Sequence, residues 1–126
     1  MTTTGPRLTK FDPLKKSHIA IGLEPGGKRI EVYRGTFWVK KNGVVEWYCD
    51  REVEEPTHKH SKHCFTVKFN KDGSPFKSAR FTSNAHGYAC SGAVKGHVSP
   101  DVNKKYRYTV SMKGKADLDP RGGVQP

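Results

Sequence analysis

The chain has 126 residues, of which 33% are hydrophobic, and a mean hydropathy of −0.78. This length suits one domain with a small core, and the lack of any apolar run of about 18 residues excludes a membrane-spanning helix. The formal net charge of +11 favours polyanions as partners, namely nucleic acid, anionic lipid or an acidic protein. A charged surface that merely keeps a soluble domain dispersed would account for the same excess.

The N-terminal residues 1–17 predict a flexible arm, because Pro6, Asp12-Pro13 and Lys15-Lys16 interrupt any regular period. Residues 18–126 are then expected to form a single domain. The start of the chain carries no apolar core of a signal peptide, so the protein as written is predicted to be cytoplasmic. A trimmed form of a secreted protein would begin in the same way.

The first half of the domain predicts short strands. Residues 18–23 and 44–49 are rich in apolar side chains, and residues 29–33 alternate between polar and apolar, the period of a half-buried strand. Residues 37–39 form another β-rich run. The dipeptide Asn42-Gly43 separates residues 37–39 from 44–49 and predicts a β-hairpin, because both of its residues tolerate positive φ.

The second half continues the pattern. Tyr106, Tyr108 and Val110 fall on one face of the clearest alternation in the chain, which predicts that they face the core. Phe76 and Phe81 are compatible with a loop or with a short helical turn held against the core. Further strands are expected at residues 64–69, 88–94, 106–112 and 118–124.

No window has the 3.6-residue apolar period of an amphipathic helix. Short strands separated by turn signals every eight to twelve residues or so are typical of an antiparallel sandwich or barrel. The sequence therefore predicts an all-β fold, an antiparallel Greek-key β-sandwich of about seven to eight strands.

Three cysteines, Cys49, Cys64 and Cys90, do not make a complete set of disulfides. Cys49 ends one predicted strand and Cys64 begins the next, so the two are expected at the same end of the sandwich. A disulfide between them would enclose residues 50–63 and stabilise the fold by roughly 3 kcal/mol. Two packed thiols are the alternative in a reducing compartment. Cys90 is predicted to be a small core residue.

One cluster has the chemistry of a metal site. Three imidazoles and a thiol within seven residues could bind copper or zinc, and these candidate ligands are His58, His60, His63 and Cys64. An extended segment would place His58 and His60 on one face. The spacing matches no zinc finger, and two interleaved lysines would repel a cation, so a solvated polar loop is the alternative.

A second cluster would suit a polyanion. Tyr88, Tyr106 and Tyr108 have basic neighbours that could contact the phosphates of single-stranded nucleic acid while the rings stack on bases. These candidate cations are Lys95, Lys104, Lys105 and Arg107. The pattern contains no RNA-binding signature, and Tyr106 and Tyr108 are also predicted to face the core.

The order of several short motifs resembles that of the cupredoxin family. These motifs are Val45-Glu46-Trp47, Phe65-Thr66-Val67-Lys68-Phe69, Ser74-Pro75-Phe76 and Tyr106-Arg107-Tyr108-Thr109. The end of the chain, from Leu118-Asp119-Pro120 to Val124-Gln125-Pro126, is similar to that of bacterial cupredoxin-like proteins of unassigned function. The resemblance covers residues 18–126 and implies the cupredoxin fold.

Blue copper needs two imidazoles, one thiolate and a weak axial ligand. The resemblance would place the first imidazole at Phe65, the thiolate at Val110 and the second imidazole near Lys113, and none of these residues can serve. Met112 falls on the predicted core face. The resemblance therefore implies the fold without blue-copper electron transfer.

Catalytic motifs are absent from the sequence. We find no nucleophile elbow, paired-carboxylate motif, zinc-protease motif or phosphate-binding loop. A non-enzymatic binding or structural module is therefore expected, with metal binding through the His58–Cys64 segment and polyanion binding as the alternatives.

Overall fold

The computed structural model describes residues 16–33, 36–61, 64–71 and 73–125. Within them the chain forms nine strands and one short 3₁₀ helix, which confirms the all-β prediction with more strands than expected. The elements are β1 (Lys16–Leu23), β2 (Ile30–Tyr33), β3 (Thr36–Lys40), β4 (Val44–Cys49), η2 (Arg51–Val53), β5 (Thr66–Phe69), β6 (Arg80–Thr82), β7 (Tyr88–Cys90), β8 (Tyr106–Ser111) and β9 (Arg121–Gln125).

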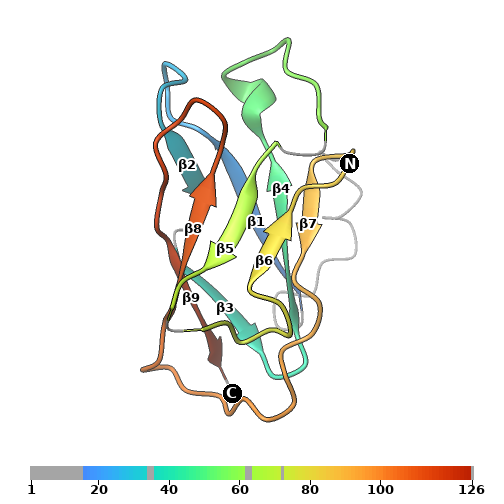
Figure 1. Ribbon diagram of the computed structural model, residues 1–126, viewed down its shortest axis with the longest axis vertical. Coiled ribbons are helices and arrows are strands. Elements are labelled where there is room, and N and C mark those ends of the chain that lie inside the picture. The colour runs from blue at the N-terminus through green and yellow to red at the C-terminus, as the bar shows by residue number, and fades with distance from the viewer. Residues whose placement is uncertain (1–15, 34–35, 62–63, 72, 126) are drawn as a thin grey trace, which may run out of the picture.

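The strands form two sheets that overlie each other (Figure 1). One has four strands in the order β2-β1-β4-β7, and the other has five in the order β3-β9-β8-β5-β6. The prediction of purely antiparallel sheets is wrong, because β1 pairs with β4 and β3 pairs with β9 in parallel. Alternation of side chains has the same period in both kinds of sheet, so it does not determine strand direction.

The Asn42-Gly43 dipeptide forms a turn but not a hairpin. Asn42 has a positive φ of 66° and the Gly43 N–H donates to the Lys40 carbonyl (2.8 Å), as expected for a tight turn. The two flanking strands, however, belong to different sheets, since β3 pairs with β9 while β4 pairs with β1 and β7. The turn therefore carries the chain from one sheet to the other.

The core lies between the sheets and is rich in aromatic rings. Trp47 is fully buried, stacks on Phe81 (ring centroids 5.6 Å apart) and donates from Nε1 to the Tyr108 hydroxyl (3.4 Å). Burial raises the pKa of Tyr108 above its usual range. Tyr106 and Tyr108 are both buried, which confirms their predicted place on the core face.

Three local predictions are corrected by the structure. β1 begins at Lys16, so residues 16 and 17 belong to the sheet, while residues 1–15 lie outside the described part of the chain. Phe76 forms an isolated bridge with Val94 and Phe81 lies in β6, so this segment contains a strand and no helical turn. Cys90 is exposed on β7 and not in the core, because the alternation of that short strand directs Ala89 inward instead.

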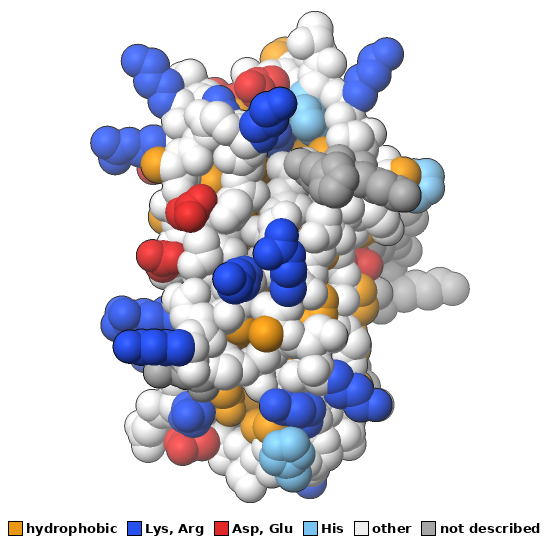
Figure 2. Space-filling view, in the orientation of Figure 1, with side chains coloured by type: hydrophobic (Ala, Val, Ile, Leu, Met, Phe, Trp, Pro, Cys, Tyr) orange, Lys and Arg blue, Asp and Glu red, His pale blue; other side chains and the backbone are white. Residues whose placement is uncertain are grey.

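The face built on the five-stranded sheet carries many Lys and Arg side chains (Figure 2). In this view, which looks onto β5, β6 and β8, acidic side chains lie mostly along the left edge. The described residues contain no helix that is long and apolar enough to cross a membrane.

Candidate metal centre

Cys49 and Cys64 lie at one end of the sandwich, where β4 ends and β5 is about to begin. The alternation of β4 directs Cys49 inward, and its side chain is 1% exposed. The Cys49 N–H donates to the Gly87 carbonyl (2.8 Å), which holds the strand end against the loop before β7. Cys64 is 2% exposed. The two thiols therefore come from segments that lead into different sheets, at the common end predicted from the sequence.

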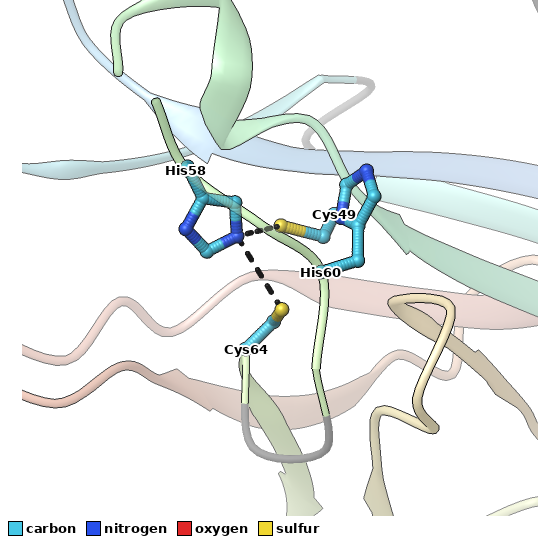
Figure 3. Close-up of side chains that lie close together, drawn as sticks. All are labelled: Cys49, His58, His60 and Cys64. Carbon is cyan, nitrogen blue, oxygen red and sulfur yellow. Dashed lines mark hydrogen bonds between the residues drawn. The ribbon is translucent and has the colours of Figure 1, made fainter. Parts of the chain in front are cut away.

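The segment after β4 turns back and brings two histidines to these thiols. Beyond η2, the Glu55 N–H donates to the Arg51 carbonyl and the His58 N–H donates to the Glu55 carbonyl, each at 2.8 Å. His58 is half-buried, and its ring is directed at both sulfurs (Figure 3). His58 Nε2 lies 3.4 Å from Cys49 Sγ and 3.4 Å from Cys64 Sγ. His60 lies at the surface, with its ring centroid 5.7 Å from that of His58.

The four side chains lie close enough together to be compared with a tetrahedral metal site. One ligand atom from each of Cys49, His58, His60 and Cys64 lies within 4.8 Å of all the others. Zinc binds cysteine sulfur at about 2.3 Å and histidine nitrogen at about 2.0–2.1 Å, so tetrahedral geometry separates sulfur from nitrogen by about 3.5 Å. Both separations from His58 Nε2 to a sulfur are 3.4 Å. His58 and the two thiols therefore have the sulfur–nitrogen separations of a zinc site, and His60 lies near enough to supply a fourth ligand atom.

Neighbouring groups support this arrangement. The Ser61 N–H donates to Cys64 Sγ (3.2 Å), a contact that helps to hold this side chain in place. Glu52 Oε2 lies 3.7 Å from His60 Nε2, so a carboxylate stands behind one imidazole, as it does in many metal sites. Gly87 has a φ of +83°, and a Cβ there would lie 2.8 Å from His60 Nδ1 and 3.1 Å from Cys49 Cβ. Glycine at this position leaves room for both side chains.

The protonation states of two of these groups follow from their burial. Burial is the main cause that raises the pKa of the Cys49 thiol to about 12, and the nearby Cys64 adds to the shift. Burial, then Arg51 and His60, lower the pKa of His58. At neutral pH and without metal, Cys49 is therefore a thiol and His58 a neutral imidazole. A cation would stabilise the thiolate that burial disfavours, so metal binding would release protons.

The structure brings together three of the four ligands proposed from the sequence. His58, His60 and Cys64 meet in the cluster, and His63 lies outside the described residues. Cys49 takes the fourth place. The predicted strand ends already placed Cys49 beside Cys64, but this proximity was interpreted only as a disulfide or a pair of packed thiols. All three cysteines of the described chain are free.

Two of the three positions at which the cupredoxin resemblance would place copper ligands belong to the core. Phe65 is 1% exposed and Val110 is fully buried, so both side chains fill space between the sheets. Met112 is also buried, and Lys113 is exposed in the turn after β8. The cluster described above is therefore a different donor set, although Cys64 directly precedes Phe65 in the chain.

The four candidate polyanion contacts do not share one element. Lys95 and Lys104 line the same surface hollow, together with His97 and Tyr106. Lys104 Nζ lies 5.2 Å from the centroid of the Tyr106 ring. Lys105 is exposed just before β8, while Arg107 projects from the outer face of β8.

Comparison with known proteins gives no family for this chain. No protein-family model matches it, and no curated protein matches it. Its function is therefore inferred from the residues of the site.

Proposed function

We propose that the protein binds a transition-metal ion through Cys49, His58, His60 and Cys64. The observation that carries the proposal is the approach of four ligand atoms to within 4.8 Å of one another, with both thiols buried. Buried thiols beside imidazoles are the donors that zinc and copper(I) prefer. The spacing of these residues in the sequence matches no known zinc motif, but their proximity in the structure is what metal binding requires.

Zn²⁺ suits the donor set best. Four protein ligands with tetrahedral spacing are typical of closed structural zinc sites, in which no position is left for substrate. Cu⁺ is the second candidate, because soft thiolates also select that ion. Cys49 is the last residue of a strand in one sheet and Cys64 precedes a strand of the other, so the ion would join the two sheets at this end of the sandwich.

Calorimetric titration of the metal-free protein with Zn²⁺ under reducing conditions tests the proposal. We expect one ion per chain and proton release that is detectable as a dependence of the heat on the buffer. Below the usual imidazole pKa of ~6.5, protonation of the histidines should weaken binding. The lowered pKa of His58 keeps that ring neutral to a lower pH than an unshifted histidine.

A matched pair of variants separates this site from adventitious binding. His58→Ala/Cys64→Ser removes two of the proposed ligands, whereas His97→Ala/Cys90→Ser removes the same residue types at exposed positions outside the cluster. The first variant should lose the stoichiometric heat and the second should keep it. Equal affinity in both variants, with native circular dichroism, would rule out the cluster as the binding site.

The proposal also concerns the class of protein and its fold family. The protein would be a non-enzymatic binding or structural module on a Greek-key sandwich similar to the cupredoxins. Its support is the burial of Phe65 and Val110 at two of the family's ligand positions, together with the two-sheet arrangement. Addition of Cu²⁺ should then give no intense absorption near 600 nm, and such a band would contradict the loss of the blue copper site.

A further inference from the structure

The outer face of the five-stranded sheet carries one basic residue on each strand. Side chains that alternate with the buried residues of these strands point away from the core, and all five basic residues do so. They are Lys40 on β3, Arg121 on β9, Arg107 on β8, Lys68 on β5 and Arg80 on β6. None of these five strands contains Asp or Glu.

Four of these cations form a continuous row across the sheet. Arg121 lies directly opposite Arg107, and Lys68 lies directly opposite Arg80. Lys68 also pairs with Thr109, two residues along β8 from Arg107, which makes it a diagonal neighbour of Arg107. With strands ~4.8 Å apart, the row from β9 to β6 spans roughly 14 Å. We call this row of Lys68, Arg80, Arg107 and Arg121 the basic row.

Like charges that face each other across strands destabilise a sheet. The basic row contains two such pairs and no acid on its own strands, so an anionic partner would relieve repulsion as well as add attraction. Acidic groups do lie beside it: Asp117 lines the hollow next to Lys68, and Asp119 accepts a hydrogen bond from Thr109 (2.7 Å). The opposite sheet has a different character, with Glu31 on β2 and Glu46 on β4.

An aromatic ring shares this outer face. Trp38 on β3 is half-buried and packs against Gly123 of β9, where a Cβ would lie 2.5 Å from the ring. Gly123 pairs with Trp38 and lies two residues after Arg121 on β9. The Trp38 ring is therefore next to the Arg121 end of the basic row. Glycine beneath Trp38 lets the ring lie close to the backbone of β9, and the side chain stays partly exposed.

We propose that this face binds single-stranded nucleic acid, with the basic row along the phosphates and Trp38 stacked on a base. A cationic track combined with an accessible aromatic ring is how sheet-based proteins bind single strands with little sequence preference. The described residues include no α-helix that could enter a major groove, which disfavours duplex reading. Thr66, Thr82 and Ser111, also outward on these strands, add hydroxyl donors to the same face.

The salt dependence of binding to an unlabelled single-stranded oligonucleotide tests the phosphate contacts. Each contact to a single strand contributes about −0.7 to the slope of log K against log salt, so four contacts predict a slope of about −2.8. Lys68→Gln/Arg107→Gln should reduce the magnitude of the slope by about 1.4. Lys28→Gln/Arg29→Gln removes the same charges from the turn before β2 and should leave the slope unchanged.

Tryptophan fluorescence tests the stacking contact. The chain has two tryptophans, and Trp47 is fully buried, so quenching by an added oligonucleotide reports on Trp38. We expect quenching by the oligonucleotide, no quenching by heparin, and loss of the quenching signal in Trp38→Phe.

Three outcomes would overturn the inference. No binding at ~50 mM salt excludes it, because the phosphate contribution is largest at low salt. An equal loss of slope in both charge variants would mean that net charge alone drives binding. Binding of heparin and oligonucleotide with the same affinity and without quenching would identify a surface for polyanions in general. Each binding measurement is made on both metal-free and zinc-loaded protein. The result for nucleic acid is then independent of whether the proposed metal site exists.

Discussion

At the scale of single residues, burial separates the three thiols into two kinds. Cys49 and Cys64 are enclosed at the end of the sandwich, whereas Cys90 is exposed on β7. A thiol reacts with an alkylating reagent as its thiolate, so accessibility and pKa together set its rate. The raised pKa of Cys49, to about 12, keeps this residue protonated across the physiological range.

We therefore predict that Cys90 in the metal-free protein is alkylated first at pH 7 to 8. Cys49 should react far more slowly, and its rate should rise with pH up to about 12, since the raised pKa delays formation of the thiolate. Mass spectrometry of peptides after timed iodoacetamide treatment measures the order. Added Zn²⁺ should protect Cys49 and Cys64 but not Cys90. Alkylation of Cys49 as fast as that of Cys90 would contradict the burial seen here.

The same residues show what the sequence could predict. The positions of Cys49 and Cys64 at strand ends were enough to place them together, because chain continuity and strand length fix the ends of a sandwich. Cys90 was misplaced because its strand has three residues, too few for alternation to indicate which side faces the core. The role of Cys49 as a ligand depends on where His58 lies after a turn, which periodicity does not encode.

At the scale of elements, β9 owes its place in the sheet to its glycines. It pairs in parallel with β3 and antiparallel with β8, which puts Gly122 opposite both Phe37 and Tyr106. The Phe37 ring occupies the space that a Cβ on Gly122 would need. Phe37 is in turn packed among Trp47, Phe69, Phe76 and Tyr108, so it has little room to move.

Gly122→Ala should therefore destabilise the fold by about 2 kcal/mol, within the range for overpacked cores. Gly96→Ala is the matched control, because a Cβ at that position meets no atom within 4 Å. Its effect should stay within about 0.5 kcal/mol, as for other surface substitutions. Urea unfolding followed by circular dichroism measures both variants. A Gly122→Ala protein as stable as the control would show that β9 can shift away from Phe37.

Strand pairing also explains why the basic row could not be predicted from the sequence. The strands themselves were predictable from alternation, for example Tyr106 to Ser111 of β8. The basic row was not, because Lys68 and Arg107 become neighbours only through the pairing of β5 with β8, some forty residues apart in the chain. The Asn42-Gly43 dipeptide predicted the position of a turn correctly. It did not show that β3 and β4 pair with other strands, β3 with β9 and β4 with β1.

At the scale of the whole molecule, the cluster lies where the chain passes from one sheet to the other. The segment from Cys49 to Cys64 leaves one sheet and enters the other, and its described part contains only the three-residue helix η2 as regular structure. A metal ion bound at both ends of this segment would close a loop, as a disulfide does. Since the ion binds the folded chain through residues that separate on unfolding, its binding free energy adds to stability.

We therefore predict that Zn²⁺ raises the melting temperature of the metal-free protein. At a free concentration one hundred times the dissociation constant, the gain is about 2.7 kcal/mol, which corresponds to a rise in Tm on the order of 10 °C for a domain of this size. A chelator should reverse the rise, and Mg²⁺ should not reproduce it, because Mg²⁺ disfavours thiolate ligands.

His58→Ala should lower the gain while leaving the Tm of the metal-free protein nearly unchanged, because that side chain is only half-buried. His97→Ala should keep the full gain. If zinc left the Tm of the wild type unchanged while calorimetry still showed binding, the ion would have to bind folded and unfolded chains equally, and the cluster would not join the two sheets.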